Sequence, residues 1–183
     1  MSLAADYAAS PEDLARAMQG RCYALSVPYT LAGRDGTVPT LDALAREVVR
    51  RVLAPAGLRP ELELALEPLP LGLRLASALS LWLHEVVSNA TSHALGSLPR
   101  PRLVLASRRD EQQMVLTVVD NGPGLPPGFD PARDASMGLT VARAVASHDL
   151  GGSMELKALD PGLEVRLFIP HSELEALNRE AWS

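Results

Sequence analysis

One long segment, residues 73–95, constrains the fold of this chain more than any other, because its two faces differ in character. Apolar side chains recur along one face at three- and four-residue spacing, the pattern of a helix that packs against a hydrophobic core. They are Leu75, Leu79, Trp82, Leu83, Val86, Val87, Ala90 and Ala94. The opposite face carries small polar groups, namely Ser77, His84, Glu85, Ser88, Asn89, Ser92 and His93. The segment therefore predicts a core helix with one polar side.

The polar side has an unusual composition for a helix surface. Contact with solvent is the common reason for a polar stripe, but exposed helix surfaces are usually filled with Glu, Lys and Arg. This stripe has one acid and no long basic side chain. Glu85, Asn89 and His93 are each four residues apart, so they project from the same side of the helix. A carboxylate there can orient a water or hydroxyl, and an amide oxygen can hold a hard metal ion, so we expect the floor of a cavity.

The order of predicted elements indicates the fold class. Helices are expected at residues 11 to about 25 (ending before Pro28), 41–53, 73–95 and 137–148, and strands at 61–67, 102–107, 114–120, 154–159 and 163–169. Thr40 is the expected N-cap of the second helix. Mostly antiparallel strands with helices between them predict a two-layer α/β sandwich.

The same pattern suggests a division of the chain. Residues 1–10 are expected to form a flexible leader and residues 11–54 an N-terminal helical segment. Residues 55–170 are expected to form the domain that contains the sheet, and residues 171–183 a short tail helix.

Composition excludes several classes of protein. Of the 17 Lys and Arg residues, only Lys157 is a lysine, and it lies outside any Gly-rich loop, which excludes a P-loop. The tripeptides His-Arg-Asp and Asp-Phe-Gly of Ser/Thr/Tyr protein kinases do not occur. A net charge of −5 argues against nucleic-acid binding through phosphate contacts. No apolar run approaches the roughly 20 residues of a membrane span. Cys22 is the single cysteine, which suits a reducing cytoplasm.

Two further segments have the character of a ligand site. Residues 120–124 place Asp120 at the end of an apolar strand, before Gly122 and Gly124. An ordinary turn can explain this pattern, but a carboxylate here could also accept a hydrogen bond from a ligand amino group, with the glycines allowing close approach. Residues 136–140 open a helix, whose free N–H groups favour anions.

In this order, the segments resemble the ATP-binding domain shared by gyrase, heat-shock chaperones, histidine kinases and mismatch-repair proteins, the Bergerat fold. Residues 84–93 resemble the N box, 120–124 the first glycine box, 136–139 the second, and 146–170 the closing Gly-Gly segment and hairpin of bacterial sensor histidine kinases. The resemblance implies a mixed sheet covered on one face by helices, with ATP and Mg²⁺ as ligands and a short lid at residues 125–137.

The resemblance also implies a role for each matching residue. Glu85 corresponds to the catalytic residue that assists proton removal during phosphoryl transfer, and Asn89 to the Mg²⁺ ligand. Asp120 corresponds to the carboxylate that reads the adenine amino group. The other implied ATP contacts are His93 beside the phosphates, Gly122 and Gly124 in the adenine pocket, and Gly138 and Leu139 at the hinge of the lid.

Three positions depart from the family pattern. Ser92 stands where kinases often have Lys or Arg, and Leu163 where a Thr usually helps to hold adenine through water. The second glycine box keeps one glycine, Gly138. These departures leave open a degenerate adaptor that binds partners and not ATP.

The N-terminal part bears on the kind of enzyme. No histidine precedes His84, so a phosphoacceptor histidine on a helical hairpin is expected outside this chain, in the same parent protein or in trans. Residues 11–31 resemble the end of the second hairpin helix of non-standard sensor kinases. The resulting expectation is the catalytic part of a cytoplasmic two-component histidine kinase, with a response regulator as partner and a possible homodimer through the N-terminal helices. An anti-sigma factor with serine kinase activity on the same fold is the alternative.

Overall fold

A computed structural model describes residues 10–32, 38–131 and 133–179. Within them the helices are α1 (Pro11–Leu31), α2 (Leu41–Leu53), α3 (Leu73–His93), the 3₁₀ helix η1 (Leu95–Ser97), α4 (Met137–Ala144), the π-helical turn η2 (Val145–Asp149) and α5 (His171–Asn178). The strands are β1 (Glu61–Ala65), β2 (Arg102–Arg109), β3 (Gln113–Asp120), β4 (Ser153–Leu159) and β5 (Gly162–Pro170). Of the predicted leader, residues 1–9 lie outside the described part, as do residues 180–183 at the end of the predicted tail helix.

The strands form one five-stranded sheet in the order β1-β2-β3-β5-β4. β1 pairs with β2 in parallel, and the other neighbours are antiparallel. The register places Asp120, the last residue of β3, opposite Leu103 of β2 and Leu163 of β5. The prediction of a mixed, mostly antiparallel sheet is thus confirmed.

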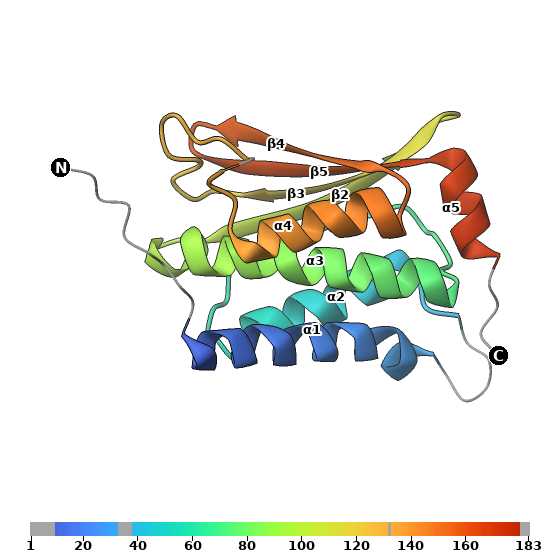
Figure 1. Ribbon diagram of the computed structural model, residues 1–183, viewed down its shortest axis with the longest axis horizontal. Coiled ribbons are helices and arrows are strands. Elements are labelled where there is room, and N and C mark those ends of the chain that lie inside the picture. Colours follow the sequence, from blue (N-terminus) through green and yellow to red (C-terminus); the bar gives the residue numbers. More distant parts are fainter. Residues whose placement is uncertain (1–9, 33–37, 132, 180–183) are drawn as a thin grey trace.

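The elements lie in layers (Figure 1). α3 and α4 cover one face of the sheet, and α1 and α2 pack on the side of α3 that is turned away from the strands. The predicted sandwich is therefore present, with the N-terminal helical segment added behind α3. Among the described residues, no helix combines the length and apolar character needed to cross a bilayer.

α1 continues through Pro28 to Leu31, so the prediction that this helix ends before Pro28 is wrong. A proline inside a helix removes one hydrogen bond and crowds the carbonyl four residues earlier, at a cost of about 3 kcal/mol. Here the last turn is held from outside the helix: Val27 is fully buried, and the Arg51 guanidinium of α2 donates to Ser26 Oγ at 2.9 Å and Thr30 Oγ1 at 3.2 Å. Tertiary contacts therefore outweigh the cost of the proline.

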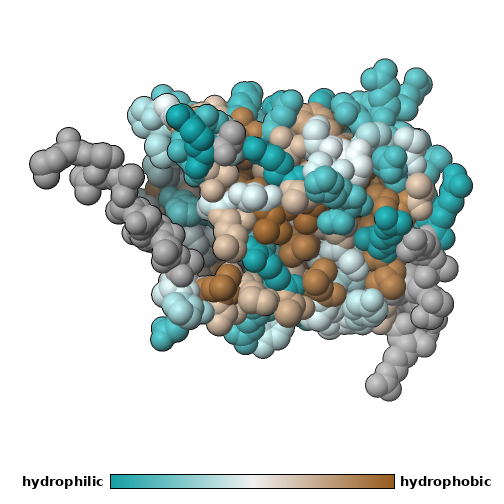
Figure 2. Space-filling view, viewed as in Figure 1, coloured by the Kyte–Doolittle hydropathy of each residue, from teal (hydrophilic) through white to brown (hydrophobic). Residues whose placement is uncertain are grey.

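α1 carries an exposed apolar stripe, made of Leu14, Met18, Leu25 and Tyr29. These side chains recur at four- and seven-residue spacing, so they share one face of the helix. Each is at least 42% exposed. Figure 2 shows hydrophobic side chains gathered over α1 on this face of the molecule.

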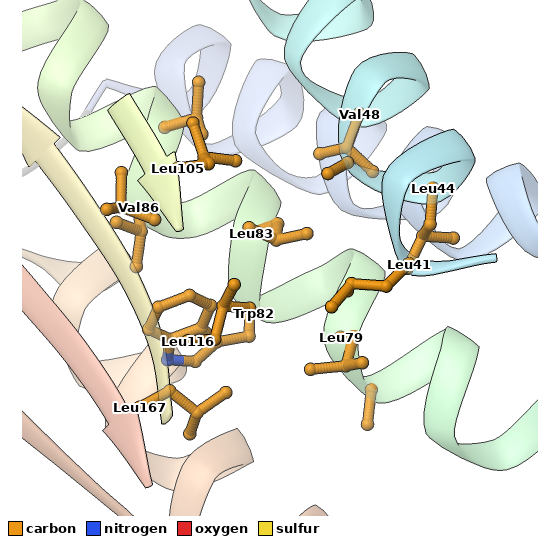
Figure 3. Packing of buried hydrophobic residues seen from close by; sticks show 14 of the residues in the cluster. Leu41, Leu44, Val48, Leu79, Trp82, Leu83, Val86, Leu105, Leu116 and Leu167 are labelled. Carbon is orange, nitrogen blue, oxygen red and sulfur yellow. The ribbon is translucent and has the colours of Figure 1, made fainter. Parts of the chain in front are cut away.

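The core is continuous from the sheet to the N-terminal helices (Figure 3). Trp82 of α3 is fully buried and lies beside Leu116 of β3 and Leu167 of β5. On the other side of α3, Leu44 and Val48 of α2 belong to the same buried cluster. α3 is thus buried on two sides, and Glu85 and Asn89 lie on the strip that remains.

The entry to α2 is fixed by backbone and side-chain hydrogen bonds. Thr40 caps the helix as predicted, with its hydroxyl accepting from the Ala43 N–H at 3.4 Å. The Leu41 N–H donates to the Leu69 carbonyl and the Leu71 N–H to the Pro39 carbonyl, both at 2.9 Å. These bonds attach α2 to the segment that leads into α3.

Because α2 shares the core, a cavity in α2 should destabilise the whole unit. We expect Leu44→Ala to lower the free energy of unfolding by about 2–5 kcal/mol, the usual effect of deleting a buried leucine side chain, since Leu44 is fully buried. Urea unfolding followed by far-UV circular dichroism and by tryptophan fluorescence measures this. Both probes should shift together in one transition, and an unchanged fluorescence transition would show that α2 unfolds independently.

Candidate functional site

One cavity lies between α3, the end of β3 and the loop that precedes α4, and has a volume of about 480 Å³. This volume is in the range of pockets that hold small molecules. Its lining is mostly apolar, with a few polar groups, and consists of Asn89, Ala90, His93, Ala94, Asp120, Pro123, Gly124, Leu125, Pro126, Pro127, Gly128, Phe129, Asp134, Ser136, Leu139 and Leu163. We call it the first cavity.

Asp120 is the buried carboxylate of the first cavity, with 6% of its surface exposed. The Gly122 N–H donates to Asp120 Oδ1 at 2.8 Å and fixes the side chain. Burial raises the pKa of the Asp120 carboxyl above its ordinary value, and hydrogen bonds from the Gly122 and Leu163 backbone oppose part of that rise. Burial of an ionised Asp120 is thus costly in the free protein, and a hydrogen bond from a ligand donor to this carboxylate would offset that cost.

The glycines of this loop permit close packing around Asp120. A Cβ on Gly122 would lie 2.3 Å from the Ala94 Cβ, so only glycine fits against α3 there. Gly124 has φ = +76°, a conformation that residues with a Cβ rarely adopt, and its Cβ would lie 2.9 Å from the Gly162 carbonyl oxygen. The loop from β3 therefore passes very near both α3 and the β4–β5 hairpin.

Asn89 and Ser136 meet where α3 faces the start of α4. The Ser136 hydroxyl lies 3.4 Å from Asn89 Oδ1, and it accepts a hydrogen bond from the Leu139 N–H at 3.2 Å as the N-cap of α4. His93 is exposed at the rim, one turn along α3. The lining of the first cavity thus combines the buried Asp120 carboxylate with amide, hydroxyl and imidazole groups from α3 and the start of α4.

A second, smaller cavity of about 210 Å³ adjoins the first. Asn89, His93 and Ser136 line both, so they form the shared wall. The remaining lining comes from α1 and α3 and from the start of α4: Leu14, Ala17, Arg21, Glu85, Ser88, Ser92, Met137 and Gly138.

Glu85 in the second cavity is buried and is paired with Arg21 of α1. Arg21 Nε lies 2.7 Å from Glu85 Oε1, and Nη2 lies 3.3 Å from Oε2. Arg21 Nη1 also lies 3.8 Å from the sulfur of Met137. On the α4 side, a Cβ on Gly138 would come within 2.8 Å of Glu85 Oε2, so a side chain at that position would collide with the carboxylate.

The structure therefore distributes the predicted site residues over two connected cavities. Asn89, His93, Asp120, Gly124 and Leu139 line the first, and Asn89 and His93 also line the second together with Glu85 and Gly138. Gly122 lines neither cavity, but its backbone N–H donates a hydrogen bond to Asp120.

Two polar residues of these cavities, Ser136 and Arg21, have no role assigned from the sequence. Ser136 had a usable signal, because a serine before a predicted helix is a typical N-cap. Arg21 had none, since it lies 64 positions from Glu85 on a different helix.

The positions that depart from the family pattern lie in different places. Ser92 is exposed and lines the second cavity, not the first. Leu163 is buried and adds an apolar wall beside Asp120 in the first.

This arrangement of a mixed sheet, a polar strip on α3 and a glycine loop after β3 belongs to a known class of domain. Residues 77–173, just over half of the chain, match the family described as "Histidine kinase-, DNA gyrase B-, and HSP90-like ATPase". The chain belongs to this family, and the predicted resemblance is confirmed.

Among curated proteins, the chain is similar to sensor histidine kinases. It is 32% identical over 97 residues to the sensor histidine kinase PdtaS of Mycobacterium tuberculosis, covering 52% of this chain and 19% of that protein. It is 30% identical over 97 residues to PdtaS of Mycolicibacterium smegmatis, with the same coverage. The match thus spans about a fifth of the length of these relatives.

Solved structures show the same fold. The histidine kinase domain of the blue-light activated histidine kinase EL346 from Erythrobacter litoralis superposes with a TM-score of 0.73 at 21% identity, covering 90% of this chain and 79% of that one. The superposed part is longer than the domain that contains the sheet, so the likeness in fold extends into the N-terminal helices.

Two glycines of the loop provide a matched test of how closely it packs. Gly124 and Gly128 both have positive φ (76° and 75°), but a Cβ on Gly128 would contact nothing within 4 Å. We expect Gly128→Ala to cost about 1 kcal/mol from the backbone conformation alone, and Gly124→Ala clearly more because of the clash with Gly162. Thermal unfolding of the two variants measures the difference; equal effects would contradict the close packing at Gly124.

Proposed function

We propose that this chain is the ATP-binding catalytic part of a two-component sensor histidine kinase. It binds ATP and Mg²⁺ and transfers the γ-phosphate to a histidine on a helical hairpin outside this chain. Membership of the ATPase family and similarity to sensor histidine kinases support the class of activity. The observation that carries the proposal for this chain is the buried Asp120 carboxylate in the lining of the first cavity.

Asp120 is the adenine contact in this proposal. Its carboxylate accepts a hydrogen bond from the exocyclic amino group, and Gly124 and Leu163 bring backbone and apolar surface against the ring. Leu139 and the loop at residues 125–134 cover the nucleotide from the α4 side. Pairing with the amino group also offsets the cost of burying an ionised carboxylate.

The phosphate end of the site fits a magnesium ion held together with the nucleotide. Mg²⁺ prefers hard oxygen ligands and usually binds through one or two protein groups plus substrate phosphates and waters. Asn89 Oδ1 is such an oxygen, and Ser136 Oγ lies beside it. Asn89 would hold the ion, whose charge would neutralise the phosphates. His93 adds a donor at the rim.

The chemical step transfers one phosphoryl group. The bond between the γ-phosphorus and the bridging oxygen breaks, a bond to a ring nitrogen of the acceptor histidine forms, and ADP leaves. Glu85 accepts the proton that the acceptor imidazole gives up. For this role Glu85 must be free of Arg21, with which it is paired in this structure.

The proposal includes partners and a cellular setting. The acceptor hairpin belongs to the same parent protein or acts in trans, and the phosphate passes on to a response regulator in a cytoplasmic phosphorelay. The apolar stripe on α1 suits a helix of a second copy, which supports a homodimer through the N-terminal helices. No nucleic acid and no membrane contact take part in this scheme.

ATP binding can be tested by thermal shift. Mg-ATP at 100 times its Kd should stabilise the protein by about 2.7 kcal/mol and raise the Tm by a few degrees. Asp120→Asn should abolish that rise without lowering the Tm of the free protein, because burial raises the pKa of Asp120 and disfavours the charged carboxylate. For the same reason, the ATP effect should weaken on acidification at a higher pH than an ordinary aspartate would give.

No rise in Tm for the unmutated protein at millimolar Mg-ATP would contradict the kinase proposal and favour the adaptor.

The role of Glu85 can be separated from binding. With a histidine-bearing hairpin supplied in trans, Glu85→Gln should retain ATP binding but slow phosphoryl transfer about 100-fold or more, the usual share of a general base. Radiolabelled transfer and nucleotide titration measure the two effects, and an equal loss of both would refute the role. An acid-labile phosphate on the partner marks histidine chemistry, whereas an acid-stable one would favour the serine kinase.

A further inference from the structure

The second cavity contains a charge that the known site pattern does not account for. Arg21 comes from α1, and it is the only Arg or Lys that lines either cavity within the described residues. Its side chain is 20% exposed, and it meets Glu85 through both Nε and Nη2. An arginine at this position contacts the residues of the N box without being part of it.

Other basic side chains near the cavities are engaged elsewhere or favour the neutral form. Arg133 is paired with Asp130 at 3.0 Å, and Arg143 donates to the Pro131 carbonyl at 3.3 Å. Burial lowers the pKa of the His84 imidazole and so favours its neutral form, although the charge of Glu85 opposes this. Ser92, where a longer basic side chain could have reached the same space, ends in a hydroxyl. The basic group that the α3 strip lacks is therefore supplied by α1.

In the proposed binding mode, a triphosphate extends from the first cavity toward Arg21 in the second. With the base at Asp120, the phosphates extend toward Asn89, His93 and Ser136, which form the wall shared with the second cavity. The terminal phosphate is the part that reaches furthest from the base, so it is the part that approaches the second cavity.

We propose that Arg21 binds the γ-phosphate of ATP, and that its ion pair with Glu85 breaks when it does so. This inference rests on the proposed function and adds a binding residue to it. Arginine matches phosphate oxygens as well as it matches a carboxylate, and both can be bound through two parallel N–H groups. Because the γ-phosphate and the Glu85 carboxylate compete for one guanidinium, arrival of ATP releases Glu85.

The exchange predicts that the site distinguishes ATP from ADP. ADP ends one phosphate short and leaves the Arg21–Glu85 pair in place. ATP reaches Arg21, and the freed Glu85 oxygens can then accept the proton of the acceptor histidine. The pair thus keeps the carboxylate occupied until a transferable phosphate is bound.

The test compares the affinities of an unreactive ATP analogue and of ADP. Calorimetric titrations with adenylyl imidodiphosphate and with ADP, both with Mg²⁺, give a preference ratio for each variant. Arg21→Gln should lower the analogue affinity about tenfold or more, the usual effect of a lost charge-assisted contact, and leave ADP affinity unchanged. Arg16→Gln is the matched control on the same helix, because Arg16 lines neither cavity, and its ratio should equal that of the wild type.

Two further variants distinguish a lost contact from a displaced α1. Glu85→Gln removes the competitor, so it should raise the preference for the analogue over ADP. The double variant Arg21→Gln/Glu85→Gln leaves no unpaired charge between α1 and α3, and it should still show the low preference of Arg21→Gln. Arg21→Lys keeps the charge and should restore part of the preference.

The outcomes separate this inference from the proposed function. If neither nucleotide binds the wild type, the proposed function fails. If both bind but Arg21→Gln weakens them equally, or leaves both unchanged, the γ-phosphate contact is overturned while ATP binding stands. A preference for the analogue that returns to the wild-type value in the double variant would also overturn it, because Arg21 would then act only through Glu85.

Discussion

The burial of α3 on two sides is the constraint on which the rest of the structure depends. Trp82 and its neighbours face the sheet, while α2 covers the other apolar flank through Leu44 and Val48. One strip of α3 is left between α1 and the start of α4. Glu85 and Asn89 lie on that strip, so the packing that stabilises the fold also sets their positions.

The same packing sets the electrostatics of the site. Asp120 is buried because β3 ends beneath the glycine loop, and its raised pKa records the cost of holding a charge there. Glu85 is buried beneath α1, and Arg21 supplies the compensating charge. An interior with few polar groups strengthens each of these interactions. The two carboxylates therefore have different partners. Backbone N–H groups orient Asp120, whereas the guanidinium of Arg21 neutralises Glu85.

Much of the fold could be predicted from the sequence because it depends on patterns among residues that are close together in the chain. The amphipathic spacing of residues 73–95 gave α3, the Thr40 cap gave the start of α2, and the Asp-Asn-Gly step gave the end of β3. The extension of α1 beyond Pro28 could not be predicted, because it depends on Arg51 and on burial of Val27. Nor could the Arg21–Glu85 pair, which joins helices that no spacing rule relates. Local chemistry marked Asp120 and its glycines, while tertiary packing determined what lies beside Glu85.

The central claim is that Asp120 reads the amino group of adenine, and it is tested most directly by removing that group from the ligand. Purine riboside triphosphate has the shape of ATP without the exocyclic amino group. The account predicts that, in calorimetric titration with Mg²⁺, it binds about 10- to 100-fold more weakly than ATP, since the buried carboxylate loses its partner. Equal affinity of the two nucleotides would contradict the assignment of Asp120 and of the first cavity as the adenine site.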